Sequence, residues 1–234
     1  MYYYWSMKKL VVGNWKMNPA SLKEAQELFD AIKDGIKGAK AEVVICPPFI
    51  YLSQLKGLPL GAQDVFYEER GTFTGEISPT QLKDLGVEYV LVGHSERRKL
   101  GETSELVAKK MQAALTAGLK VILCVGENEG ENKEEVLRQQ LAGVSGVIVA
   151  YEPVWAISTG DPYKTKALPT PQIVKESADL IKKILGDENV RVIYGGSTNA
   201  ANAKEYLEVV DGLLPGGASL KADEFVKIVE SASV

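Results

Sequence analysis

Three side chains that could take part in proton transfer follow directly on short apolar runs. Lys16 comes after LVVGNW, His94 follows YVLVG and is the only histidine of the chain, and Glu152 follows VIVAY. An ammonium group can hold an anionic substrate, and a neutral imidazole can donate a hydrogen bond to a substrate oxygen. A carboxylate in a water-poor site is a suitable general base. These types favour acid–base chemistry on an anionic substrate, provided that the fold brings them together.

Each of these residues also has an ordinary structural explanation. A single histidine after an apolar run can simply be a hydrogen-bonded structural residue, most lysines are solvated, and a carboxylate at a strand end can pair with a lysine. Ser95 and Glu96 look like the start of a helical turn, whose amide groups disfavour a charged imidazole at His94. Asn14 lies close to Lys16 and strengthens its interpretation as a substrate-binding cation.

Two glycine pairs occur late in the chain, Gly195–Gly196 before Ser197 and Gly216–Gly217. Glycine pairs often form ordinary turns, but glycine also lets backbone N–H groups approach a phosphate closely. In many barrels the loops after the seventh and eighth strands form a phosphate site. The two pairs therefore predict a phosphate-binding site.

The elements that must position these residues are short apolar runs separated by amphipathic stretches. Runs that are apolar throughout indicate strands covered on both faces, as in a parallel sheet. We predict strands over 9–15, 42–46, 58–63, 88–93, 120–125, 147–152, 191–195 and 212–214. The amphipathic stretches predict helices over 21–36, 105–117, 171–185 and 222–231, with start signals at Ser21 and Ser78–Pro79 and stop signals at Gly86, Gly118 and Gly186.

Eight strands alternating with helices predict an α/β fold, a single-domain (β/α)8 TIM barrel over residues 7–234. The alternative is an open doubly wound sheet, which is weakened because no G-x-G-x-x-G follows the first strand. Residues 1–6 are expected to be a non-functional extension. In such a barrel the carboxyl ends of the strands form the active site, which is where Asn14, His94 and Glu152 fall.

Composition bounds the setting of the protein. The 234 residues are 45% hydrophobic and carry a formal net charge of −4, which favours no nucleic acid and no acidic membrane surface as partner. No apolar stretch approaches the roughly 20 residues that cross a bilayer. Cys46 and Cys124 lie outside any metal-ligand spacing and are expected to be small core residues in a reducing, cytoplasmic protein, with no metal site.

Eight strings of the sequence resemble the triosephosphate isomerase family, in the family's order and from about Lys9 to Val229. They are GNWKMN (13–18), GAQ (61–63), GTFTGEISP (71–79), GHSERR (93–98), CVGE (124–127), AYEPVWAI (150–157), YGGS (194–197) and GGASL (216–220). Each string alone would be weak evidence for the resemblance, but the whole set is specific to this family.

The resemblance implies interconversion of dihydroxyacetone phosphate and D-glyceraldehyde 3-phosphate, in glycolysis and gluconeogenesis, without metal or organic cofactor. By similarity, Glu152 is the base, His94 polarises the carbonyl, Lys16 and Asn14 stabilise negative charge, and Glu96 orients Lys16. The phosphate would bind at Ser158, Ser197, Gly216 and Gly217. The resemblance also implies a homodimer formed through loop 66–78, and a tetramer stays open.

The sequence departs from the family's pattern in the segment after Glu152. AISTG is followed by DPYKTKALP, longer than the usual lid, and Ser158 stands where the family has a glycine. Pro215 replaces an apolar residue before the last glycine pair. Two alternatives therefore stay open: a catalytically weakened relative that only binds triose phosphates, and another phosphosugar barrel enzyme.

Overall fold

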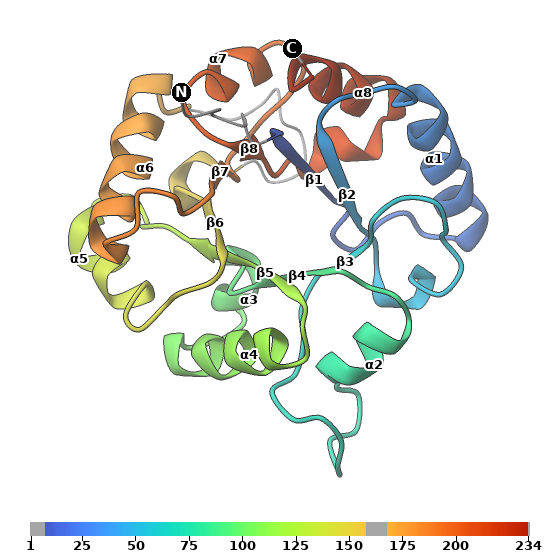
Figure 1. Cartoon of the computed structure of the whole chain (residues 1–234), viewed down its shortest axis with the longest axis horizontal. Helices are drawn as coiled ribbons and strands as arrows, with labels where there is room; N and C mark the ends of the chain where they lie inside the picture. The colour runs from blue at the N-terminus through green and yellow to red at the C-terminus, as the bar shows by residue number, and fades with distance from the viewer. Residues whose placement is uncertain (1–7, 158–167, 234) are drawn as a thin grey trace, which may run out of the picture.

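The computed structural model describes residues 8–157 and 168–233, which form a ring of eight parallel strands surrounded by helices (Figure 1). Ser158 and residues 1–6, on which predictions were made from the sequence, lie outside this described part. The strands are β1 Leu10–Asn14, β2 Glu42–Cys46, β3 Gly61–Ala62, β4 Tyr89–Val92, β5 Lys120–Val125, β6 Ile148–Tyr151, β7 Val192–Tyr194 and β8 Gly212–Leu213.

The strand order closes the sheet into a barrel. Hydrogen-bonded neighbours run β2-β1-β8-β7-β6-β5-β4-β3, and a parallel bridge between Ile45 and Leu60 joins the two ends. The predicted single-domain (β/α)8 barrel is therefore confirmed, and the open doubly wound sheet is excluded. β3 is shorter than the predicted 58–63, because Pro59 has no N–H group to donate to a ladder.

Both faces of the strands are buried, which explains why their sequences are apolar throughout. In β1, Leu10 and Val12 belong to a cluster inside the barrel, while Val11 packs in the outer cluster beneath the helices. Successive side chains of a strand point to opposite faces, so a barrel strand needs apolar residues at every position.

The helices for which the sequence carries start or stop signals begin or end at those signals. The described helices are α1 Leu22–Gly35, α2 Pro79–Asp84, α3 Ser95–Lys99, α4 Ser104–Thr116, α5 Lys133–Gln140, α6 Pro171–Leu185, α7 Ala203–Leu207 and α8 Ala222–Ser231, with 3-10 turns η1 Phe49–Tyr51, η2 Val154–Ala156 and η3 Gly217–Leu220. Of these helices, α5 and α7 were not predicted. Ser21 accepts a hydrogen bond from the N–H of Glu24, and Ser78 forms a reciprocal capping box with Gln81. Gly86, Gly118 and Gly186 have positive φ.

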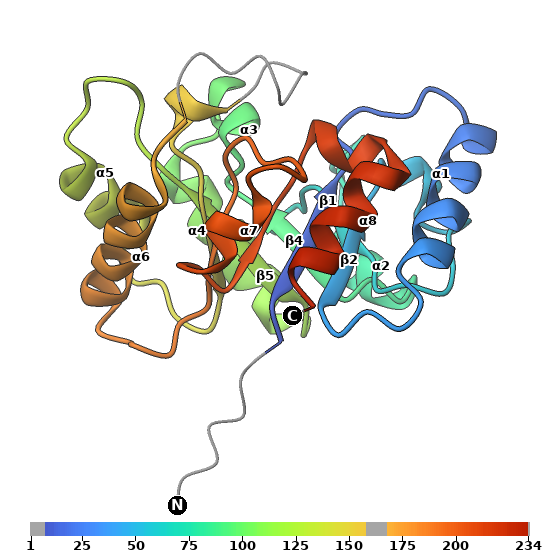
Figure 2. The same ribbon diagram turned by 90° about the horizontal axis from the view of Figure 1, so that it is seen from above.

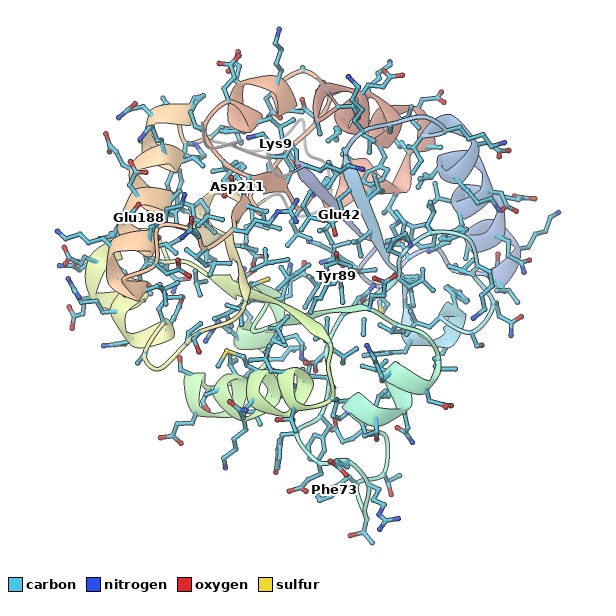
Figure 3. All side chains as sticks on the ribbon, in the orientation of Figure 1. Lys9, Glu42, Phe73, Tyr89, Glu188 and Asp211 are labelled. Atoms are coloured by element: carbon cyan, nitrogen blue, oxygen red, sulfur yellow. The ribbon has the colours of Figure 1, made fainter. Side chains whose placement is uncertain are left out.

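The two ends of the barrel carry different side chains. Figure 2 shows α3 at the end opposite to the start of β1, which is the end where the strands finish. At the other end, Lys9, Glu42, Tyr89 and Asp211 surround the centre of the ring (Figure 3). Arg191 reaches across this opening to Glu42, with 2.6 Å between Nη1 and Oε2. This ion pair joins the residue before β7 to the first residue of β2, at the end of the barrel opposite to the carboxyl ends of the strands.

Candidate active site

The end of β1 positions Lys16 through an unusual backbone conformation. Lys16 has φ of 53°, the one positive φ of a non-glycine residue among the described residues. Its N–H donates to Oδ1 of Asn14 at 3.0 Å, and its Nζ lies 2.6 Å from Oε1 of Glu96. A left-handed conformation is costly for a residue with a Cβ atom, so surrounding contacts must hold it. Asn14 supplies one of these backbone contacts, whereas Glu96 contacts the ammonium group at the end of the side chain.

His94 follows β4 and caps the N-terminus of α3. Its Nδ1 accepts a hydrogen bond from the N–H of Glu96 at 3.2 Å. An accepting Nδ1 carries no proton, so the proton of the neutral ring is on Nε2. Nε2 lies 3.6 Å from Oε1 of Glu152. The helix start thus presents an N–H donor towards the carboxylate.

Glu152 directly follows β6 and is 1% exposed. Oε2 accepts from the N–H of Ser95 at 3.3 Å, and Oε1 is buried without a hydrogen-bond partner in the described part of the chain. A Cβ atom at Gly195 would lie 2.7 Å from Cγ of Glu152, so only glycine fits there. A buried carboxylate oxygen with no partner is costly for stability and is the kind of group found at reactive sites.

Neighbouring charges act on two further groups. Burial alone would raise the pKa of Glu96, but the hydrogen bond and the charge of Lys16 outweigh it and hold the pKa below its ordinary value. Glu96 is therefore a carboxylate at neutral pH and keeps its ion pair with Lys16. Burial, together with the charge of Glu152, raises the pKa of Cys124 well above its ordinary value, which leaves it an inert thiol.

One pocket contains the predicted phosphate loops but not Glu152, which lines a separate pocket together with Ser95 and Cys124. The lining of the first pocket includes Asn14, Lys16 and His94 together with Ser197 and both glycine pairs, 195–196 and 216–217. Gly217 begins η3, whose first N–H groups are free of helical partners. Ser197 was predicted to bind phosphate. In this structure its N–H and Oγ both donate to the carbonyl of Ala156, at 3.2 and 2.9 Å.

Pro215 keeps a structural role despite lacking an N–H group. Its carbonyl accepts the N–H of Asn14 at 3.0 Å, which continues the pairing of β8 with β1 beyond the last strand residues. The substitution therefore fits the end of this strand.

Glu127 is a residue of the site region to which the sequence reasoning gave no role. It is buried and accepts hydrogen bonds from Tyr151 Oη at 3.0 Å and from Trp155 Nε1 at 3.2 Å. It thereby anchors η2, the turn that follows Glu152. An acidic residue one glycine beyond an apolar strand, in CVGE, was the available signal.

The described residues contain neither a metal-binding cluster nor a membrane-spanning helix. No group of three or more His, Cys, Asp or Glu side chains in 8–157 and 168–233 is arranged to hold a metal ion. Within the same residues, no helix has the length and apolar character needed to span a membrane.

The fold is a (β/α)8 barrel in which His94 and Glu152 approach each other at the carboxyl ends of the strands, beside a pocket lined by Lys16 and the two glycine pairs. Comparison with known proteins is consistent with this class. The family model described as "Triosephosphate isomerase" matches residues 9–232. Similar curated proteins are the triosephosphate isomerases of Alkaliphilus oremlandii, 43% identical with 95% of this chain and 98% of that protein covered, and of Coprinopsis cinerea, 44% identical with 94% and 96% covered. The chain belongs to the triosephosphate isomerase family.

Proposed function

We propose that the chain interconverts dihydroxyacetone phosphate and D-glyceraldehyde 3-phosphate, an aldose–ketose isomerisation in glycolysis and gluconeogenesis. The observation that carries the proposal is the 3.6 Å approach of Glu152 Oε1 to Nε2 of His94, which itself lines the pocket of Lys16 and the two glycine pairs. Family membership supports the same reaction. Ketose and aldose are isomers, so proton transfers alone balance the chemistry.

The side chains suit successive parts of this reaction. Glu152 takes a proton from the carbon next to the carbonyl group, and the Nε2–H of His94 donates to the carbonyl oxygen as it gains negative charge. The pairing of a glutamate base with a neutral histidine is the established chemistry of this family. The ammonium group of Lys16 adds positive potential, and Glu96 orients it.

Phosphate binding couples the pocket to the turn after Glu152. Backbone N–H groups of Ser197, Gly216 and Gly217 are proposed donors to the phosphate, with Ser158 as a fourth. The N–H of Ser197 is held by the carbonyl of Ala156 in this structure. Phosphate binding at Ser197 would therefore break this bond and displace the end of η2.

A coupled assay tests the proposal by comparing D-glyceraldehyde 3-phosphate with D-glyceraldehyde. We expect turnover of the phosphorylated substrate, with kcat/KM at least about 10³-fold higher than for the unphosphorylated aldehyde, because binding of the remote phosphate contributes to the chemical step. No turnover of either substrate would overturn the proposal. Tight binding of triose phosphate without turnover would instead support a weakened, binding-only relative.

We also propose that two copies of the chain pair through loop 66–78. The loop projects from the barrel beside α2, with Phe73 near its tip (Figures 1 and 3). Phe73 packs on Phe66 with 4.8 Å between ring centroids, so the loop has an apolar centre of its own. Met17, Ile50 and Leu100 are 93%, 76% and 83% exposed and follow β1, β2 and β4 on the same rim. Such a group of exposed apolar side chains is typical of a protein interface.

Replacing Phe73 by aspartate should dissociate this dimer, because a charge would enter the apolar interface. Sedimentation velocity should give twice the chain mass of 25.4 kDa for the unmodified protein and a single-chain mass for Phe73→Asp. Leu85→Asp is the matched control, since Leu85 and Phe73 are 39% and 40% exposed and Leu85 ends α2. A monomeric unmodified protein, or a dimeric Phe73→Asp variant, would contradict the proposed interface.

We further propose a reducing, cytoplasmic setting. Cys46 and Cys124 are both free and buried, and burial raises the pKa of each thiol. Free thiols without a disulfide framework are usual in reducing compartments.

A further inference from the structure

Gln63 makes two hydrogen bonds that reach the backbone beside the site. It directly follows β3, and its Nε2 donates to the carbonyl of Lys16 at 2.7 Å and to the carbonyl of Cys46 at 2.9 Å. The Cys46 carbonyl also accepts the N–H of Trp15 at 3.1 Å. One side-chain amide therefore fastens the segment after β1 to the end of β2.

The carbonyl that Gln63 holds belongs to the strained residue of the site. Lys16 has φ of 53°, and its N–H is already bound by Oδ1 of Asn14. With Gln63, both backbone polar groups of Lys16 are held by side chains, one from β1 and one from the residue after β3. Strained conformations persist where the surroundings fix them from several sides.

The ion pair of Lys16 with Glu96 does not replace this backbone contact. The Glu96 side chain is 48% exposed, and both partners have flexible stems. An ion pair of this kind can orient the ammonium group, but it contributes little to holding the backbone of Lys16. The direction in which the Lys16 side chain leaves the barrel rim is set by its backbone.

We propose that Gln63 is a positioning residue for the isomerisation: its two hydrogen bonds hold Lys16 in the left-handed conformation that directs the ammonium group into the pocket. This inference rests on the proposed role of Lys16 in the reaction. Gln63 acts through Lys16 and needs no contact with the substrate.

Gln63→Met tests the inference, because methionine keeps the length of the side chain and removes both donors. We expect kcat/KM for D-glyceraldehyde 3-phosphate to fall about 10- to 100-fold, since small misplacements of a positioned group cost this much. The inhibition constant of inorganic phosphate should rise at least about fivefold, because the cation that attracts the anion has moved. A purely structural role would lower the melting temperature without weakening phosphate inhibition.

Asn132→Ala is the control for a general loss of stability. Asn132 caps α5 far along the chain from Lys16, and its Oδ1 accepts the N–H of Glu135 at 3.2 Å. We expect this variant to melt earlier and to keep the kcat/KM and the phosphate inhibition of the unmodified protein. If Gln63→Met keeps both values within about twofold of the unmodified protein, the inference is wrong.

A crystal structure of Gln63→Asn gives an independent readout that needs no activity. Asparagine is one methylene shorter and cannot hold both carbonyls, so φ of Lys16 should become negative. A retained positive φ would overturn the inference even if Gln63→Met does not fold. If the unmodified protein has no isomerase activity, the proposed function fails, whereas the φ of Lys16 still decides whether Gln63 holds this backbone.

Discussion

Replacing Glu152 by glutamine is expected to lower kcat/KM by on the order of 10³-fold or more. Glutamine keeps the shape of the side chain but cannot take a proton, and a positioned general base contributes about 10²- to 10⁴-fold. The variant should be at least as stable as the unmodified protein, because Oε1 of Glu152 is buried without a partner among the described residues. Steady-state kinetics and urea unfolding of the same preparation measure both quantities.

Glu88→Gln is the matched control for this substitution. Glu88 precedes β4 at the opposite end of the barrel and makes an exposed contact with Lys120 at 3.5 Å. This variant should keep its activity within about twofold, as surface substitutions usually do. A Glu152→Gln variant that retains more than about a tenth of the activity would show that another group abstracts the proton.

Replacing Lys110 by methionine is expected to destabilise the protein by about 3–5 kcal/mol. Lys110 is 2% exposed in α4, and its Nζ donates to both carboxylate oxygens of Asp64, at 2.9 and 2.8 Å, and to Glu102. Arg97 Nε also donates to Glu102 at 2.9 Å. Removing the ammonium group leaves two buried carboxylates with one half-exposed partner. Urea unfolding measures the loss.

Lys109→Met is the neighbouring control. Lys109 is exposed and lies 5.6 Å over the ring of Tyr67, so its loss should cost less than about 1 kcal/mol. If the two substitutions lowered the free energy of unfolding equally, the buried ion pairs of Lys110 would contribute no more to stability than the exposed contact of Lys109.

The pH dependence of the Lys110→Met effect follows from the carboxylates. Burial alone would raise the pKa of Glu102, but hydrogen bonds from Lys110 and Arg97 hold it below its ordinary value. Its stabilising contribution is thus present at neutral pH and is lost as the pH falls through the lowered value. Burial raises the pKa of Asp64, so the free-energy cost of burying its negative charge is relieved when the carboxylate is protonated in acid. The stability difference between the two proteins should therefore narrow as the pH falls below about 4, where Glu102 of the unmodified protein takes up its proton.

The sequence predicted the barrel, and the gathering of polar residues at one of its rims, for one physical reason. A strand covered on both faces must be apolar at every position, as Val11 and Val12 show with their opposite orientations. In a parallel barrel the carboxyl ends of all strands meet at one rim, so polar residues that end strands must gather there. Asn14, His94 and Glu152 were predicted from the sequence in this way.

The residues that support the site could not be predicted, because their contacts connect distant parts of the chain. From the sequence, Gln63 is expected only to be the polar end of a short strand. No neighbouring residue indicates that its side-chain amide reaches Lys16. The positive φ of Lys16 has no signature in its neighbours. Lys110 lies in an amphipathic helix where a solvated lysine is the ordinary expectation, and its partner Asp64 is distant in the chain.

The most direct test of the account is a crystal structure with bound 2-phosphoglycolate, whose carboxylate imitates the charge of an enediolate. We expect its carboxylate to accept hydrogen bonds from His94 Nε2 and Lys16 Nζ and to lie within about 3 Å of Glu152 with one proton shared between the two carboxyl groups, while its phosphate binds the N–H groups of Ser197 and Gly217. A phosphate bound elsewhere on the molecule, or a Glu152 carboxylate that makes no contact with the ligand, would contradict the account.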